Sequence, residues 1–176
     1  TTGNWSIGTT NNINYVSIGI DPGVDPNEDN TLNATMTGGA WRIRHLNFYN
    51  DTAFDYDVTL SDATSTLGRR VDRIDYSGKG DFNLSLTDTR VRYPQVFEAD
   101  SMTLTLGTQR MNSLESDAVS NVVTMGSGSL TYGRLGGYEL ATVNVVNGGS
   151  GYIAALEFAD LTTNTINNGG EFGSIR

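Results

Sequence analysis

The feature that most constrains this chain is a short pattern that returns about every twenty residues. In each copy an apolar residue is followed by two other residues and then by a second apolar residue. The eight copies are residues 15–18, 43–46, 71–74, 93–96, 111–114, 132–135, 153–156 and 172–175. Their first residues are separated by steps of 28, 28, 22, 18, 21, 21 and 19 residues. Such a period predicts stacked repeats, in which each rung buries its apolar face only against its neighbours.

A second segment in each repeat alternates apolar and polar residues. Phe82, Leu84 and Leu86, for example, are separated by Asn83 and Ser85. Period two predicts a strand with one buried face, and stacking predicts a buried column of such residues. The predicted column is Leu60, Leu86, Leu106, Met125, Val145 and Ile166. The expected fold is an all-β parallel β-solenoid of about seven to eight rungs of roughly 20 residues, with glycines at its corners.

The chain of 176 residues fits a single solenoid domain, residues 1–176. We expect residues 1–14 to form an N-terminal cap, and residues 21–30 and 61–68 to leave the coil as loops. Residues 172–175 begin a last rung, so that end of the solenoid is expected to be open. Unpaired strand edges favour addition of further strands, and self-association through open solenoid ends is therefore the expected partnership.

The charge of the chain excludes some partners. The net charge is −9 and Lys79 is the sole lysine, which argues against a nucleic-acid backbone and an anionic membrane. The sequence contains no cysteine, and no run is long and apolar enough to cross a membrane. These properties favour a secreted or cell-surface protein without nucleic-acid partner or membrane insertion.

Residues 78–84, Gly-Lys-Gly-Asp-Phe-Asn-Leu, resemble one copy of the RTX nonapeptide, the hemolysin-type calcium-binding repeat. Over residues 66–176 the repeat style is similar to the β-solenoid regions of large calcium-binding secreted proteins of marine bacteria. The resemblance implies a right-handed parallel coil with Ca²⁺ bound between turns, and the candidate ligand in this copy is Asp81, next to the repeat's own ligand position. Ser77 stands in place of the repeat's first glycine, and Phe82 stands where the repeat has its ligand aspartate.

A second candidate calcium site is the acidic segment within residues 21–30. Asp25, Asn27 and Asp29 place oxygen ligands at alternate positions, and Asp21 precedes them. Ca²⁺ prefers such carboxylate and amide oxygens. The alternative is a solvated acidic loop, because the segment lacks the glycine and the final glutamate of an EF-hand loop. Calcium is accordingly the cofactor that the sequence suggests.

Basic and acidic residues alternate in the middle of the chain. Five arginines lie near Asp72, Asp75 and Asp81; they are Arg69, Arg70, Arg73, Arg90 and Arg92. They either bind an acidic sugar, as in parallel β-helix lyases and epimerases, or form cross-rung ion pairs. Tyrosines that recur near the turns are either glycan platforms or caps of the core columns. The only histidine, His45, has no partner in the sequence that would make it a catalytic base.

The sequence thus favours a structural secreted or cell-surface module, an adhesin or a self-assembling filament subunit, stabilised by calcium. A glycan-binding or polysaccharide-active module is the alternative. Rows of threonine on the outer strand faces suggest an ice-binding solenoid as a remote alternative. We expect no catalytic residues, since nucleophile-elbow, phosphate-loop and dinucleotide signatures are absent.

Overall fold

The computed structural model describes residues 2–8, 13–19, 30–37, 42–50, 55–62, 70–87, 89–136, 141–147, 151–158, 162–168 and 171–175. Over these residues the chain forms strands and no helix, so it contains no helix that could span a membrane. One sheet contains β1 (Thr2–Gly8), β3 (Asn30–Thr37), β5 (Tyr56–Asp62), β7 (Asp81–Thr87), β9 (Ser101–Leu106), β11 (Ser120–Met125), β13 (Ala141–Asn147) and β15 (Thr162–Asn168). The other contains β2 (Ile13–Gly19), β4 (Arg42–Asn50), β6 (Arg70–Gly78), β8 (Arg90–Phe97), β10 (Arg110–Ser116), β12 (Ser129–Leu135), β14 (Tyr152–Phe158) and β16 (Glu171–Ile175).

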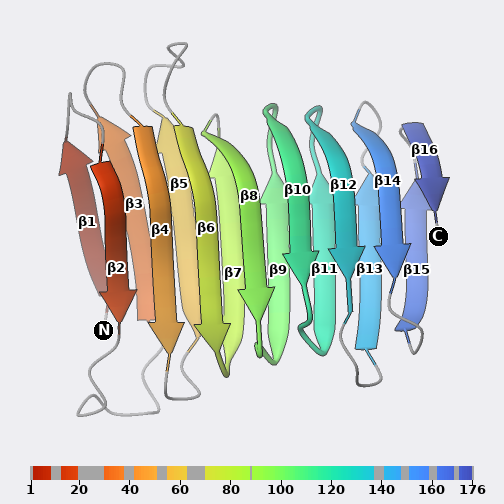
Figure 1. The fold of residues 1–176 in the computed structure, drawn as a ribbon, viewed down its shortest axis with the longest axis horizontal. Helices are drawn as coiled ribbons and strands as arrows, with labels where there is room; N and C mark the ends of the chain where they lie inside the picture. Colours follow the sequence, from red (N-terminus) through yellow and green to blue (C-terminus); the bar gives the residue numbers. More distant parts are fainter. Residues whose placement is uncertain are drawn as a thin grey trace.

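The two sheets lie face to face and every strand pairs in parallel with its neighbours (Figure 1). Consecutive strands of the chain belong to alternate sheets, so each rung contributes one strand to each sheet. The two ends of the chain lie at opposite ends of the long axis (Figure 1). The predicted all-β parallel β-solenoid is confirmed.

The core lies between the sheets, and the buried side chains that the structure describes run from Ile43 of β4 to Leu156 of β14. In the odd-numbered sheet the pairing places Val58, Leu84, Leu104, Val123 and Val145 in one buried column. Because rungs are only about 4.8 Å apart, each of these side chains touches those above and below it. Burying one such side chain is worth roughly 1.5–3 kcal/mol, which makes the column the main stabilising element of the fold.

Aromatic side chains fill the core where β4 to β7 meet. The rings of Tyr76 and Phe82 stack with centroids 4.5 Å apart, and Phe48 lies 5.6 Å from Phe82. The Tyr76 hydroxyl donates a hydrogen bond to the carbonyl of Lys79 at 2.6 Å, so its polar end is satisfied at the turn.

The repeated apolar-x-x-apolar pattern corresponds to a bend in the even-numbered strands. Ile43 and Leu46 are buried, whereas Arg44 is exposed and His45 is half-buried. The pairing of β4 with β6 joins Ile43 to Val71 and then His45 to Arg73, and it passes over the residue between. Two successive side chains therefore point outward at the bend, as they do at a β-bulge.

Three of the eight predicted copies are shifted by two residues. The structure aligns residues 13–16, 91–94 and 130–133 with the pattern, in place of 15–18, 93–96 and 132–135. The tyrosines that begin the wrong copies, Tyr15, Tyr93 and Tyr132, are exposed. The reason is that strand alternation is unchanged by a slip of two residues, so it cannot fix the register by itself.

The predicted core column contains the same error after Met125. Leu60, Leu86, Leu106 and Met125 do lie in one column, but the next residue of that column is Asn147. Val145 and Ile166 belong to the column of Leu104 instead.

Parts of the predicted domain plan lie outside the described residues. Strand β1 falls within the expected cap segment, and it is the edge strand of its sheet, paired with β3. Of the expected loops, residues 21–29 and 63–68 lie outside the described residues, and Asn30, Ser61 and Asp62 belong to strands.

Candidate functional site

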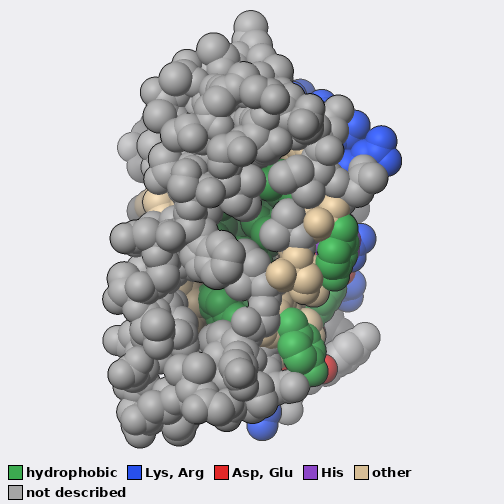
Figure 2. Space-filling model, turned by 90° about the vertical axis from the view of Figure 1, so that its left-hand side faces the viewer, with side chains coloured by type: hydrophobic (Ala, Val, Ile, Leu, Met, Phe, Trp, Pro, Cys, Tyr) green, Lys and Arg blue, Asp and Glu red, His purple; other side chains and the backbone are tan. Residues whose placement is uncertain are grey.

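Seven of the eleven basic residues lie on four neighbouring strands of the even-numbered sheet. They are Arg42, Arg44, Arg70, Arg73, Arg90, Arg92 and Arg110, and together they are called the arginine face. The same four strands carry three carboxylates, which leaves a surplus of four positive charges in a chain whose net charge is −9. In the end-on view, Lys and Arg side chains gather along one side of the molecule (Figure 2). Positive charge is therefore concentrated on one face.

Four of these arginines form a column across the strands. Arg42 pairs with Arg70, and Arg70 pairs with Arg90. In the pairing of β8 with β10, Glu115 lies opposite Gln95. When the same register is followed back along both strands, Arg110 lies opposite Arg90. Each arginine directly precedes a buried apolar residue, so its own side chain belongs to the outer face.

Asp72 is the main counter-charge inside the arginine face. Its side chain is only 12% exposed, and it forms ion pairs with Arg42, with Arg70 (Nε to Oδ1, 3.0 Å) and with Arg92 (Nη1 to Oδ1, 3.9 Å). The Arg70 contact has ion-pair distance without hydrogen-bond geometry. One carboxylate thus holds three guanidinium groups, and positive charge remains in excess.

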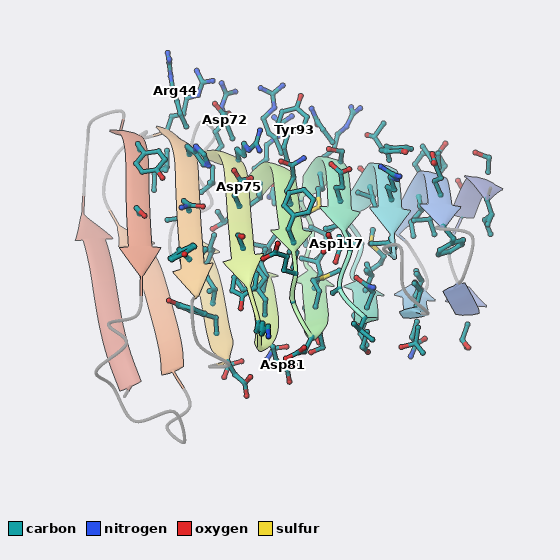
Figure 3. The ribbon with its side chains drawn as sticks, turned by 60° about the horizontal axis from the view of Figure 1, so that its bottom comes forward. Arg44, Asp72, Asp75, Asp81, Tyr93 and Asp117 are labelled. Carbon is teal, nitrogen blue, oxygen red and sulfur yellow. The ribbon has the colours of Figure 1, made fainter. Side chains whose placement is uncertain are left out.

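Two arginine donor atoms within the face are buried without a partner. Arg90 Nε and Arg92 Nε are inaccessible to solvent and make no hydrogen bond. The Arg92 guanidinium lies over the ring of Tyr93, 5.6 Å from its centroid. Arg44, Asp72 and Tyr93 project from the same outer side of the sheet (Figure 3).

Next to the column, hydrogen bonds link side chains within β6 and between successive rungs. Asp75 accepts from Arg73 Nε at 2.7 and 2.8 Å and lies 2.7 Å from His45 Nε2. Arg73 also donates to Gln95, whose Nε2 donates to Glu115 Oε2 at 2.7 Å. Of the predicted cross-rung ion pairs, the described residues contain the one between Arg92 and Asp72, whereas Arg70 and Arg73 pair with aspartates of their own strand. His45 is engaged with the carboxylate of Asp75.

The same network continues toward the last rungs. Arg134 Nη1 lies 3.5 Å from Glu115 Oε1, and the Tyr132 hydroxyl donates to Glu157 Oε2 at 2.7 Å. The hydrogen bond to Glu157 and, to a smaller degree, burial raise the pKa of Tyr132. Surface pairs of this kind contribute little each, but together they fix the outward side chains of the sheet.

Exposed tyrosines accompany the arginines on this sheet. Tyr15, Tyr93 and Tyr132 are 55%, 40% and 38% exposed, and Tyr152 is also exposed. The interpretation of these rings as caps of the core columns is wrong for them, although Tyr76 is buried in the core. They present flat apolar faces to solvent beside charged groups.

The acidic residues at the corners bind backbone amides. Asp81 N–H donates to Asp55 Oδ1 at 2.9 Å, Gly80 N–H donates to Asp100 Oδ2 at 3.0 Å, and Glu98 N–H donates to Asp117 Oδ1 at 2.7 Å. Each of these bonds joins different rungs. The carboxylates thus satisfy backbone donors at turns.

The candidate calcium ligands fall into two groups. Asp21, Asp25, Asn27 and Asp29 lie outside the described residues. Asp81 begins β7, on the other side of the molecule from Arg44 and Tyr93 (Figure 3). The described part of the chain contains no group of three or more His, Cys, Asp or Glu residues that could hold a metal ion.

Sequence reasoning found part of the arginine face and missed Arg42, Arg44 and Arg110. The signal was present, because an arginine directly precedes the first apolar residue of four consecutive rungs: Arg42-Ile43, Arg70-Val71, Arg90-Val91 and Arg110-Met111. The wrong register at Tyr93 concealed this recurrence.

The threonine rows expected for an ice-binding face are also interrupted. The register places Val122 between Thr103 and Asn144, so this column is not a regular threonine row.

Comparison with known proteins gives no family: no protein-family model, no curated protein and no solved structure matches this chain.

Proposed function

We propose that this protein is a structural, non-catalytic module of a secreted or cell-surface protein, of the adhesin or filament type. The observation that carries the proposal is the uniform stacking of rungs along one axis, with the same pairing from β1 to β15 and from β2 to β16. Such a solenoid is a rod whose length depends on the number of rungs, and each rung is stabilised by its neighbours. A rod of this kind holds its outer faces at fixed spacing.

Self-association through the ends of the rod is part of this proposal. In the structure β15 pairs with β13 and β16 pairs with β14, each on one side. The backbone N–H and C=O groups on their other sides offer a template for another parallel strand. A head-to-tail contact of this kind repeats and produces a filament.

Stabilisation by calcium, as in RTX-like repeats, is the second part of the proposal. Its support is the sequence of residues 21–30, where Asp25, Asn27 and Asp29 alternate as oxygen ligands. The corner carboxylates of Asp55 and Asp100 already accept backbone N–H groups. We therefore assign any calcium effect to residues 21–30.

The assembly is tested by light scattering after size exclusion and by negative-stain electron microscopy, each in Ca²⁺ and in EDTA. We expect filaments or elongated oligomers, and an extension of proline and charged residues after Arg176 should prevent them. A glycine-serine extension of equal length is the control. Monomers under all conditions, or filaments unaffected by the proline extension, would contradict assembly through the ends.

Calcium binding is tested separately by calorimetry. The double variant Asp25→Asn/Asp29→Asn keeps side-chain length and removes both charges, and it should abolish the binding heat. The matched control is Glu171→Gln, which removes an exposed carboxylate at the far end of the chain. Binding that survives in the double variant would move the calcium site elsewhere, and an absence of binding in the unmodified chain would remove calcium from the proposal.

A further inference from the structure

We propose that the arginine face binds a linear acidic polysaccharide built of uronic acid residues, with one carboxylate for each rung. This inference goes beyond the structural role and does not depend on self-assembly. It starts from the column of Arg42, Arg70, Arg90 and Arg110, in which one guanidinium is presented by each of four consecutive strands. A periodic array of cations matches a periodic polyanion.

The spacing of the array determines the kind of polyanion. Neighbouring strands are about 4.8 Å apart, so the arginine Cα atoms repeat at that distance along the stack. This is close to the length of one sugar residue in an extended polysaccharide. A polyuronate chain that lies across the strands therefore carries its carboxylates at nearly the same repeat as the arginines.

The chemistry of the side chains favours carboxylate as the ligand group. The planar guanidinium fork donates two parallel hydrogen bonds to a carboxylate, and such charge-assisted bonds are stronger than neutral ones. Asp72 forms ion pairs with Arg42, Arg70 and Arg92, and the pair with Arg42 includes a hydrogen bond from Nε. Because three arginines share one aspartate, the arginine face has more hydrogen-bond donors than the protein's own carboxylates can accept.

Unsatisfied donors add a second, independent indication. Arg90 Nε and Arg92 Nε are buried without a hydrogen-bond partner. Buried donors are almost always paired, and an unpaired one costs roughly 1–3 kcal/mol. The Arg92 side chain is 29% exposed and Arg90 is half-buried, so both residues meet solvent, and a ligand would reach their Nε atoms only if the guanidinium groups turn outward.

The exposed tyrosines favour a sugar over a phosphate polymer. Tyr93 lies beside Arg92, and Tyr15 packs edge-on against His45 with ring centroids 5.0 Å apart. Flat rings at the surface fit the apolar C–H faces of sugar rings. Double-stranded DNA carries one negative charge per roughly 1.7 Å of its axis, which is much denser than the repeat of the arginines.

The proposal is tested with oligogalacturonates of two to eight residues, by calorimetry at low and moderate salt. We expect affinity to rise with length up to oligomers that span four rungs and then to level off. The variant Arg90→Gln/Arg110→Gln should bind about tenfold or more weakly. These two arginines are chosen because neither forms an ion pair with Asp72, so that carboxylate keeps its partners.

Matched variants separate specific contact from general charge. Lys79→Gln/Arg176→Gln removes the same two charges outside the four strands of the arginine face and should bind like the unmodified chain. Arg90→Lys/Arg110→Lys keeps the charge, loses the forked geometry, and should bind at an intermediate level. Circular dichroism and thermal unfolding confirm that each variant is folded.

Four results with anionic ligands would overturn the proposal. They are no binding of oligogalacturonate at low salt, equal loss in both glutamine variants, binding independent of length, and equal or tighter binding of dextran sulfate or oligo-dT. The last result would show a general anion surface rather than a polyuronate site. Neutral dextran measures binding to the tyrosines alone, and its binding as tightly as oligogalacturonate would also contradict the role of the arginines.

Discussion

At the scale of single residues, Gly133 occupies an inward position that larger side chains fill in neighbouring rungs. It lies opposite Leu114 on one side and Leu156 on the other. A Cβ atom added there would come within 2.7 Å of Leu156 Cδ2 and 3.2 Å of Leu130 Cδ2. The two leucines thus use the space that the missing side chain leaves free.

We predict that Gly133→Ala lowers the free energy of unfolding by about 1–2 kcal/mol, because Leu156 must shift in a packed core. Urea denaturation measures the change. Ser113→Ala, a change of one heavy atom at a half-buried position on the neighbouring strand, is the control. Unchanged or higher stability of Gly133→Ala would show that the Leu156 side chain moves without cost.

Tyr56 makes stability depend on alkaline pH. It is buried, and burial, together with the nearby Tyr76, raises its pKa well above the usual value. An ionisable group whose folded pKa is raised contributes stability that is present below the unfolded pKa of about 10. As the pH rises above that value, the unfolded chain ionises while the folded chain stays neutral, and the stability is lost.

We therefore predict that the free energy of unfolding falls above about pH 10, by up to about 1.4 kcal/mol per pH unit for this group. Tyr56→Phe should reduce the slope, and the exposed Tyr152→Phe serves as its control. The measurement is urea denaturation at a series of pH values. An identical alkaline slope in Tyr56→Phe and the unmodified chain would rule out Tyr56 as the cause.

At the scale of elements, the turn between β6 and β7 is held by carboxylates from the rungs on either side. Gly80 N–H donates to Asp100 Oδ2 at 3.0 Å and Asp81 N–H donates to Asp55 Oδ1 at 2.9 Å. Gly80 has φ of 89°, a conformation that glycine adopts without strain. The two aspartates thus act as acceptors that join three rungs.

We predict that Asp55→Ala/Asp100→Ala lowers the free energy of unfolding by about 2–3 kcal/mol, since two backbone donors lose their acceptors. Asp55→Asn/Asp100→Asn keeps an acceptor oxygen at each place, so its free energy of unfolding should fall by less. Both values come from urea denaturation, in Ca²⁺ and in EDTA. The carboxylates would instead be cation ligands if two results occurred together. The asparagine variant would lose as much stability as the alanine variant, and EDTA would lower the stability of the unmodified chain only.

The elements also show how far the sequence predicts this structure. Alternation in residues 82–86 and the bend pattern at residues 43–46 predicted strands, buried faces and the parallel stack. The same patterns misplaced Tyr93 and Val145 by two residues, because a two-residue slip keeps every side chain on its own face. Register depends on side-chain volumes at turns and between rungs, which a single sequence does not display as a pattern.

The candidate site was predictable to a smaller extent, for the same reason. Charge and spacing identified Arg70, Arg90 and Arg92, but the column that joins Arg42 to Arg70 exists only in the correct register. The contacts of Asp72 depend on side chains from three strands. Because the site consists of side chains from several stacked strands, it can be predicted only when the register of those strands is known.

At the scale of the whole molecule, charge is segregated on a rigid rod. The arginine face carries surplus positive charge, while the chain as a whole is acidic. Fields of opposite sign on different faces orient a polyanion toward one sheet and away from the rest. The screening length at physiological salt is about 8 Å, so this preference acts only near the surface.

A stacked solenoid predicts a gradient of local stability along its axis. Strands β7 and β9 have neighbours on both sides in their sheet, whereas β1 and β15 pair on one side. Because each rung is stabilised by its neighbours, the end rungs open at lower free energy than the central ones. Amide exchange measured by mass spectrometry should therefore be slowest in residues 81–106 and faster toward both ends.

The same measurement connects stability with assembly. If copies add end to end, as we propose, β15 and β16 should gain protection in assembled material while residues 81–106 change little. The proline-extended chain, measured at equal concentration, is the control and should keep fast exchange in β15 and β16. Protection that increases in the arginine face and stays unchanged in the end strands would show that copies associate side by side, and the head-to-tail arrangement would then be wrong.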